Sequence, residues 1–370
     1  MKVLPNVLDR QFFQHQAEYE QKALDVLHSG WYILGKEVSA FEREFAEYAG
    51  AKACVGLASG LDALIIAFKL LGIGAGDEVI VQSNAYIACV MGITANGATP
   101  VFVEPDAYHN LDADKIEEKI TAKTKAILAV HLYGQASDMS AIKQIADKHG
   151  LILVEDCAQS HGAAFKGQKC GTFGTVGCYS FYPTKNLGAF GDAGAIVTND
   201  EKLADKFRIY RNYGSEKKYH NQMLGTNSRL DEMQAGLLRV KLKYIEEYTG
   251  ERQDICGRYL NEIRNPYIKL PKIRDGATTV WHQFVITTDY RDALIRFLES
   301  KEIFTTIHYP IPPHLSEAYG YLNYREGSFP IAEKLADSVL SLPLYNGLAR
   351  EEQAYVIAAV NAFVPEKEVL

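Results

Sequence analysis

Ser180-Phe-Tyr-Pro-Thr-Lys-Asn-Leu-Gly188 and the upstream run Leu151-Ile-Leu-Val-Glu-Asp156 are the two stretches that decide the fold of this 370-residue chain. The upstream run is apolar and ends in a carboxylate, which is typical of a buried strand. Pro183 and Gly188 interrupt both strand and helix, so we expect Lys185 on a loop between two apolar runs. The sequence therefore predicts an acidic residue at the end of one strand and a lysine just past another.

This pair of residues is what pyridoxal phosphate (PLP) chemistry requires. The amine forms the Schiff base, and the carboxylate keeps the pyridine nitrogen protonated so that the ring can act as an electron sink. Each residue taken alone has a simpler explanation. Lys185 could be a solvated surface charge, Asp156 a helix N-cap after a strand, and Gln159 a loop amide rather than a partner of the cofactor's ring hydroxyl.

Strand-like runs alternate with helical patterns on both sides of these stretches. Helices are predicted at Glu37–Tyr48, from Ser59 to Gly72, at Ala113–Thr121 and at Met139–His149. The strand-like runs are Glu78–Val81, Pro100–Val103, Ala126–Val130, Leu151–Glu155, Gly177–Phe181 and Ala193–Thr198. This alternation predicts a mostly parallel sheet covered on both faces, with the active site beyond the carboxyl ends of the strands, where Asp156 falls.

The pattern changes beyond residue 230. A long helical pattern runs from Asp231 to about Ile263, and we expect it to break near Gly250. A strand-like run at Val280–Thr287, a helix at Arg291–Ser300, a proline-rich loop and two more helical patterns follow. We therefore expect a large domain over residues 1–245 and a smaller C-terminal α/β domain over residues 246–370.

The composition narrows the class of protein. A net charge of -7 argues against nucleic acid or an anionic membrane as the main partner. The apolar stretch Cys54–Gly74 contains Asp62 and Lys69, so we expect no membrane span, and we expect no signal peptide. Six scattered cysteines without a Cys-x-x-Cys pair favour reduced thiols in a cytoplasmic protein. Prolines separate His308 from His314, so we expect no metal site.

A second constellation, Ala58-Ser-Gly-Leu-Asp-Ala63, opens a predicted helix. Gly60 would let backbone N–H groups approach an anion, and the helix dipole favours a phosphate there; an ordinary serine N-cap is the alternative. Ser180 could add a hydroxyl to the same phosphate or simply end a strand. Tyr86 could stack on a flat cofactor or pack into the core.

Two polar segments are candidates for a substrate pocket. His308-Tyr309-Pro310 could equally be a rigid turn, and Lys217-Lys-Tyr-His220 a solvated basic loop. An NAD-dependent oxidoreductase remains an alternative class, but its Gly-x-Gly-x-x-Gly loop between a first strand and a helix is absent.

Taken in order, several segments resemble the DegT/StrS family of sugar aminotransferases. The matching segments are Gly30-Trp-Tyr-Ile-Leu-Gly35, Ser59-Gly60, Gly76-Asp-Glu-Val79, His131-Leu-Tyr-Gly134, Glu155-Asp-Cys-Ala-Gln-Ser-His-Gly162, Ser180-Phe-Tyr-Pro-Thr-Lys185, Gly191-Asp-Ala-Gly194 and Asn227-Ser-Arg-Leu-Asp231. The similarity runs from about residue 30 to about residue 360. It implies a PLP enzyme with the α/β fold called PLP fold type I (aspartate aminotransferase-like).

The resemblance also implies roles for residues that match the family by position. Lys185 resembles the Schiff-base lysine, which is also the general acid and base, and Asp156 resembles the partner of the pyridinium nitrogen. The remaining cofactor ligands implied are Gln159 at the ring hydroxyl, Tyr86 as the stacking ring, and Ser59, Ser180 and the backbone of Gly60 and Leu61 at the phosphate. In this family Asn227 and the loop of Tyr219 reach into the partner subunit's active site, so a homodimer is implied.

Two departures and one retained residue refine this reading. The family usually has Thr after Ser-Gly, whereas Leu61 offers only its backbone N–H, and Cys157 replaces a common Ala. A branch of the family that dehydrates sugars has His at the position of Lys185. The lysine retained here favours transamination.

The substrate follows from a closer resemblance. Ile307-His-Tyr-Pro-Ile-Pro-Pro-His-Leu315 and Gly214-Ser-Glu-Lys-Lys-Tyr-His220 are similar to the subgroup that acts at C-3 of dTDP-3-oxo-6-deoxyhexoses. The residues then expected at the sugar are Tyr32, Tyr182, Tyr219, His308 and Tyr309. Lys217, Lys218 and Arg229 are the cations expected at the nucleotide diphosphate.

The sequence thus predicts a transaminase that moves the amino group of L-glutamate to the C-3 ketone of such a sugar. The product would be a dTDP-3-amino-3,6-dideoxyhexose, of gluco or galacto configuration, for a surface polysaccharide or a glycosylated natural product. The alternatives within the fold are a C-4 aminotransferase, a sugar dehydratase and a non-catalytic regulator.

Overall fold

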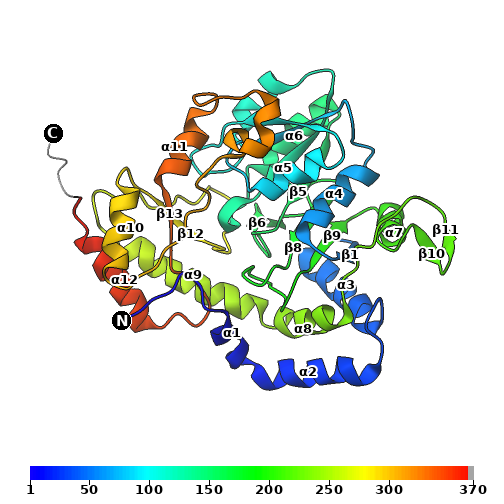
Figure 1. Cartoon of the computed structure of the whole chain (residues 1–370), viewed down its shortest axis with the longest axis horizontal. Helices are drawn as coiled ribbons and strands as arrows, with labels where there is room; N and C mark the ends of the chain where they lie inside the picture. Colours follow the sequence, from blue (N-terminus) through cyan, green and yellow to red (C-terminus); the bar gives the residue numbers. More distant parts are fainter. Residues whose placement is uncertain (366–370) are drawn as a thin grey trace.

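The computed structural model describes residues 1–365 and is built around one seven-stranded sheet (Figure 1). The strand order is β1-β9-β8-β5-β4-β2-β3. The strands are β1 (Ala53–Leu57), β2 (Glu78–Gln82), β3 (Thr99–Val103), β4 (Thr124–Val130), β5 (Ile152–Asp156), β8 (Val176–Ser180) and β9 (Gly194–Thr198). β9 runs antiparallel to both of its neighbours, and the pairs among the other five consecutive strands are parallel.

Each face of the sheet is covered by helices. The first face carries α3 (Lys36–Ala49), α6 (Met139–His149) and α8 (Glu232–Leu242), and the second carries α4 (Gly60–Leu70), α5 (Ile87–Thr94) and α7 (Glu201–Tyr210). Successive strand residues alternate between the two layers, since Ala195 and Val197 pack with the first set and Ile196 with the second. The prediction of a mostly parallel, doubly covered sheet is confirmed.

The predicted strands and most predicted helices are present with small shifts in their bounds. Asp138 caps α6 by accepting a hydrogen bond from the N–H of Ala141. The sequence reading missed β1 and the N-terminal helices α1 (Leu8–Gln14) and α2 (Gln16–Ser29).

The predicted helix at Ala113–Thr121 is wrong. The structure has two short 3-10 turns there, η1 (Ala113–Lys115) and η2 (Glu117–Lys119). The only apolar residues of this segment after the first are Ile116 and Ile120, too little apolar surface to hold a longer helix against the sheet.

The long helical pattern breaks at Lys243 and Tyr244, not near Gly250. Gly250 lies inside α9 (Ile245–Glu262), where buried neighbours such as Tyr248 and Arg252 pack the helix. This packing outweighs the roughly 1 kcal/mol by which glycine disfavours a helix.

The C-terminal part of the chain forms its own hydrophobic cluster. It contains α9, α10 (Arg291–Glu299), α12 (Arg350–Ala362) and an antiparallel pair, β12 (Phe284–Thr287) and β13 (Val339–Leu342). The helix α11 (Pro330–Ser338) lies in the same part of the sequence, but its Ala332 packs with the second helical layer of the large sheet. Val3 also packs in this cluster, because the N-terminal segment pairs with Ile303. The boundary between residues 245 and 246 stays a prediction.

The remaining elements are short. They are the 3-10 turns η3 (Leu132–Gly134), η4 (Pro313–Leu315) and η5 (Glu317–Leu322), and the two-stranded pairs β6 (Ala164–Phe165) with β7 (Gln168–Lys169) and β10 (Ser215–Lys217) with β11 (His220–Asn221). Within residues 1–365, every helix is too short or too polar to cross a bilayer.

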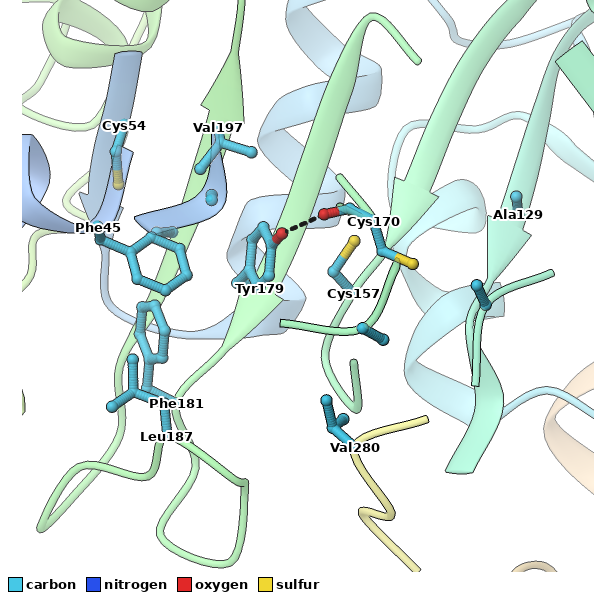
Figure 2. Packing of buried hydrophobic residues seen from close by; sticks show 14 of the residues in the cluster. Phe45, Cys54, Ala129, Cys157, Cys170, Tyr179, Phe181, Leu187, Val197 and Val280 are labelled. Carbon is cyan, nitrogen blue, oxygen red and sulfur yellow. Dashed lines mark hydrogen bonds between the residues drawn. The ribbon is translucent and has the colours of Figure 1, made fainter. Parts of the chain in front are cut away.

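The loop that carries Lys185 is fixed at both ends by the core. Phe181 and Leu187 flank it in the sequence and belong to the same buried cluster as Phe45 of α3, with Phe181 next to Phe45 (Figure 2). Phe181 makes an edge-to-face contact with Phe45, with ring centroids 5.1 Å apart. A loop anchored on both sides in this way holds its lysine in a defined place.

Candidate active site

A cavity of about 420 Å³ opens beyond the carboxyl ends of β4, β5 and β8, a size typical of small-molecule sites. Eleven of the predicted site residues line it. They are Ser59, Gly60, Leu61, Tyr86, Asp156, Gln159, Ser180, Tyr182, Lys185, His308 and Tyr309. Residues from five separate stretches of sequence therefore converge on one cavity.

One end of the cavity is a cradle for an anion. Ser59 caps α4, since its hydroxyl accepts a hydrogen bond from the N–H of Asp62 at 3.0 Å. The end of β8 lies so close that a Cβ added at Gly60 would be 2.4 Å from the Cβ of Ser180. Only glycine permits this approach, and it brings a serine hydroxyl to the positive end of a helix dipole.

Asp156 lies deeper in the cavity, as the last residue of β5. Strand alternation turns its side chain to the face covered by α5. Its Oδ1 accepts a hydrogen bond from the N–H of Ala158 at 3.0 Å, and its Oδ2 accepts one from the thiol of Cys89 at 3.0 Å. The carboxylate is thus buried and held, and it lies in the lining of the cavity.

Lys185 reaches the same cavity from the anchored loop. Burial lowers the pKa of its amine below the ordinary value, and the Asp156 carboxylate opposes that shift. Among residues 1–365, no side chain forms a hydrogen bond or ion pair with the amine. An amine whose neutral form is favoured by burial is suited to act as a nucleophile and a base.

A hydrogen-bonded network joins Gln159 to the histidine-tyrosine segment. The Gln159 carbonyl oxygen accepts from the N–H of Tyr133 at 2.6 Å, and its amide donates to the Tyr309 hydroxyl at 3.1 Å. The Tyr133 hydroxyl donates to the backbone carbonyl of His308. The Tyr86 and Tyr309 rings lie 4.9 Å apart, so both predicted aromatics lie at one wall of the cavity.

The cavity residues that were not predicted as site residues include Cys89, His282 and Gln283. The His282 ring is close to Asn186, with Nδ1 3.1 Å from Oδ1 of the amide, and burial keeps the pKa of His282 well below its ordinary value. No spacing in the sequence links these positions to Lys185. Only the fold brings them there.

Six predicted residues lie outside this cavity in a single chain. They are Tyr32, Lys217, Lys218, Tyr219, Asn227 and Arg229. Lys217, Lys218 and Tyr219 belong to the β10–β11 hairpin, which lies beyond α7 in Figure 1. Tyr219 is 85% exposed, and the Arg229 guanidinium donates to the Asn212 side chain. Their assigned roles stay predictions.

A buried group near the cavity, His131, Glu155 and Cys157, has the composition of a metal site. Its donor atoms are already engaged, however. Glu155 accepts backbone N–H groups from Gly171, Phe173 and Gly174 at 2.7–2.8 Å, and its Oε2 lies 3.0 Å from Nε2 of His131. Ser137 N–H donates to Nδ1 of His131, so Nε2 carries the proton and offers no lone pair to an ion.

The donor set fits PLP. The cradle at Ser59, Gly60 and Ser180 suits the phosphate, the Asp156 carboxylate suits a protonated ring nitrogen, and the Lys185 amine suits the aldehyde carbon. These are the groups that the cofactor needs at its two ends and at its reactive carbon.

Comparison with known proteins agrees with this geometry. The family model described as DegT/DnrJ/EryC1/StrS aminotransferase family matches residues 14–361. The chain is 52% identical to the dTDP-3-amino-3,6-dideoxy-alpha-D-galactopyranose transaminase of Aneurinibacillus thermoaerophilus, covering 95% of this chain and 96% of that protein. It is 48% identical to the dTDP-3-amino-3,4,6-trideoxy-alpha-D-glucose transaminase of Streptomyces venezuelae, covering 93% and 92%.

A solved structure shows the same architecture. The crystal structure of DesV from S. venezuelae in complex with a ketimine intermediate superposes with a TM-score of 0.96 at 46% identity. The match covers 98% of this chain and 100% of that chain.

Proposed function

Because the chain belongs to the DegT/DnrJ/EryC1/StrS aminotransferase family of PLP-dependent enzymes, we propose that it transfers the amino group of L-glutamate to the C-3 ketone of a dTDP-3-oxo-6-deoxyhexose. The product is a dTDP-3-amino-3,6-dideoxyhexose. The observation that carries this proposal is the meeting of Lys185, Asp156 and the Ser59-Gly60 cradle in one cavity. The two transaminases compared above are both named for dTDP-linked 3-amino sugars.

The residues divide the work as follows. Bound PLP supplies an electron sink that stabilises negative charge on a neighbouring carbon. Asp156 would pair with the ring nitrogen of the cofactor through its buried carboxylate, and the Ser59-Gly60 turn would hold the phosphate. Lys185 removes a proton from the α-carbon of glutamate and, in the second half of the reaction, delivers one to C-3 of the sugar. Such positioned proton transfer contributes about 10²–10⁴-fold to a rate.

The sugar occupies the wall formed by Tyr182, His308 and Tyr309. Burial lowers the pKa of His308 to about 4, so its ring is neutral and offers hydrogen bonds rather than charge. Nδ1 of His308 lies 2.7 Å from the Ser341 hydroxyl, which orients the ring. A neutral, polar wall suits the hydroxyls and ketone of a hexose.

The hairpin residues act across a subunit boundary in this proposal. Lys217, Lys218 and Arg229 bind the nucleotide diphosphate of a partner's active site, while Tyr219 and Asn227 reach the sugar and the cofactor there. Exposed aromatic side chains support a homodimer, among them Trp31 at 64%, Tyr32 at 51% and Tyr219 at 85% exposure. Active sites shared between the two subunits are part of this proposal. A cytoplasmic location is also part of it, because the six unpaired cysteines favour a reducing compartment.

The primary test is Lys185→Ala with Lys143→Ala as a control. Lys143 is an exposed lysine of α6 that pairs with Asp147. Purified parent and control should show a visible cofactor band that borohydride bleaches, and both should convert the 3-oxo sugar and glutamate to the amino sugar. Lys185→Ala should lose the bleachable band and the exchange. Amino transfer by Lys185→Ala would refute the mechanism, and a parent without any band would favour a regulator or an oxidoreductase.

Substrate scope is tested with the two C-4 epimers of the 3-oxo sugar. The product of each is defined by NMR. The 4-oxo isomer is offered as well, and amination of that isomer at C-4 without conversion of either 3-oxo epimer would refute the assigned regiochemistry.

Shared sites are tested by mixing two inactive variants, Lys185→Ala and Asn227→Ala. In a symmetric dimer with shared sites, refolded mixtures contain hybrids with one intact site and should regain about a quarter of the parental activity. A mixture that stays inactive, although hybrids form, would contradict sites built from both subunits.

A further inference from the structure

The proposed function pairs the Asp156 carboxylate with the ring nitrogen of the cofactor. The thiol of Cys89 contacts this carboxylate. Cys89 lies in the first turn of α5, on the sheet face to which Asp156 points. Its Sγ is 3.0 Å from Oδ2 of Asp156, and both residues line the cavity. Among the described cysteines it is the only one in that lining.

The direction of this hydrogen bond follows from the chemistry of the two groups. An ionised carboxylate only accepts, so the thiol must donate. Burial raises the pKa of the Cys89 thiol well above its ordinary value, and the adjacent Asp156 charge raises it further. The sulfur therefore keeps its proton and remains a donor at neutral pH.

Asp156 needs such a donor because its side chain is buried. Its other described hydrogen bond is the one from the Ala158 N–H to Oδ1. A buried carboxylate with an unpartnered oxygen is costly and free to rotate. A thiol is a weaker donor than a hydroxyl, so it fixes Oδ2 while leaving most of the negative charge for the ring N–H of the cofactor.

We propose that Cys89 is a positioning residue that donates its S–H to Asp156 and so holds the carboxylate, ionised and in one rotamer, for the pyridine ring. This inference rests on the proposed function, because it assumes that Asp156 meets the ring nitrogen. Cys89 itself takes no part in proton transfer at the substrate.

The test measures PLP affinity by titrating the apo protein, with fluorescence quenching as the readout, so it does not depend on turnover. Cys89→Ala removes the donor and should weaken PLP binding roughly 5- to 10-fold, as expected for a hydrogen bond to a charged group from a weak donor. Cys89→Ser keeps a donor and should stay within about 3-fold of the parent. Cys256→Ala, a buried cysteine of the C-terminal cluster, is the matched control and should bind as the parent does.

A double-mutant cycle separates positioning from packing. In an Asp156→Asn background the acceptor is no longer a carboxylate, so Cys89→Ala should cause little further loss. An equal loss in both backgrounds, or parental affinity in Cys89→Ala, would overturn the inference. If Cys89→Ala does not fold, Cys89→Val takes its place, because it fills the volume of the thiol without a donor.

The cycle also separates this inference from the proposed function. Parental affinity and spectrum in Asp156→Asn would remove the assigned role of Asp156, and the inference with it. Weak binding in Asp156→Asn alongside parental binding in Cys89→Ala would overturn the inference alone.

Discussion

Gly60→Ala perturbs the phosphate cradle more directly than any change to a polar side chain. The added Cβ would lie 2.4 Å from the Cβ of Ser180 and 2.9 Å from its Cα, whereas carbon atoms in contact prefer about 3.5–4.0 Å. Rotation of the serine side chain cannot relieve this overlap, because the nearest atoms are the Cβ and the backbone. The start of α4 and the end of β8 must therefore move apart by roughly 1 Å.

Two magnitudes follow from that displacement. Overpacking of this kind costs about 1–3 kcal/mol of unfolding free energy. Hydrogen bonds to a charged group contribute about 1.5–3 kcal/mol each, so misplacing one phosphate donor should weaken PLP binding roughly 10- to 100-fold.

The assay pairs a PLP titration of the apo protein with urea unfolding, and Gly250→Ala is the control. A Cβ at Gly250 meets no atom within 4 Å, so alanine there should leave PLP binding unchanged and raise the unfolding free energy by up to about 1 kcal/mol. If Gly60→Ala binds PLP as tightly as the parent, the cradle is not the phosphate site and the reasoning fails.

Three further changes have outcomes that the structure specifies. Glu155→Gln replaces an acceptor of three backbone N–H groups by an amide that cannot satisfy them all, so we expect thermal unfolding to show a loss of about 2–4 kcal/mol. Leu61→Thr adds a hydroxyl at the phosphate end of the cavity and should tighten PLP binding by roughly 3- to 10-fold in the same titration; unchanged or weaker binding would contradict the phosphate placement. Burial lowers the pKa of Lys241 to about 7, from an ordinary 10.5, so between these values the unfolded chain binds the extra proton. The unfolding free energy should then rise with pH across this window by about 4 kcal/mol at most. Urea unfolding measured from pH 7 to 10 should show a flatter rise in Lys241→Met. An unchanged slope in that variant would contradict the lowered pKa of Lys241.

Most strands and helices around the central sheet could be predicted from the sequence, because apolar residues recur with one period in a strand and another in a helix. Asp156 and Lys185 were found from local context, since a carboxylate at a strand end and a lysine in a glycine-bordered loop are visible without the fold. The failed helix at Ala113–Thr121 shows the limit of that approach. The side chain of Asp112 caps its first turn by accepting a hydrogen bond from the N–H of Asp114, but tertiary packing decides how far a helix extends.

Contacts between distant segments escaped the sequence for a physical reason. Cys89 meets Asp156 because strand alternation and the placement of α5 select the same sheet face, and neither is encoded at a fixed spacing. His282 reaches the cavity from the segment before β12. Nothing in the sequence around it distinguishes it from a histidine buried in the core.

The strand order has a consequence for how the protein is made. β1 lies at one edge of the sheet, and its neighbour there is β9, which is synthesised only after all of α4 to β8. The Ser59-Gly60 turn directly follows β1, and Gly194 of β9 lies against the backbone of Ser59. On the ribosome, therefore, the phosphate end of the cavity cannot close until β9 has emerged, and a nascent chain arrested before that strand should not retain the cofactor.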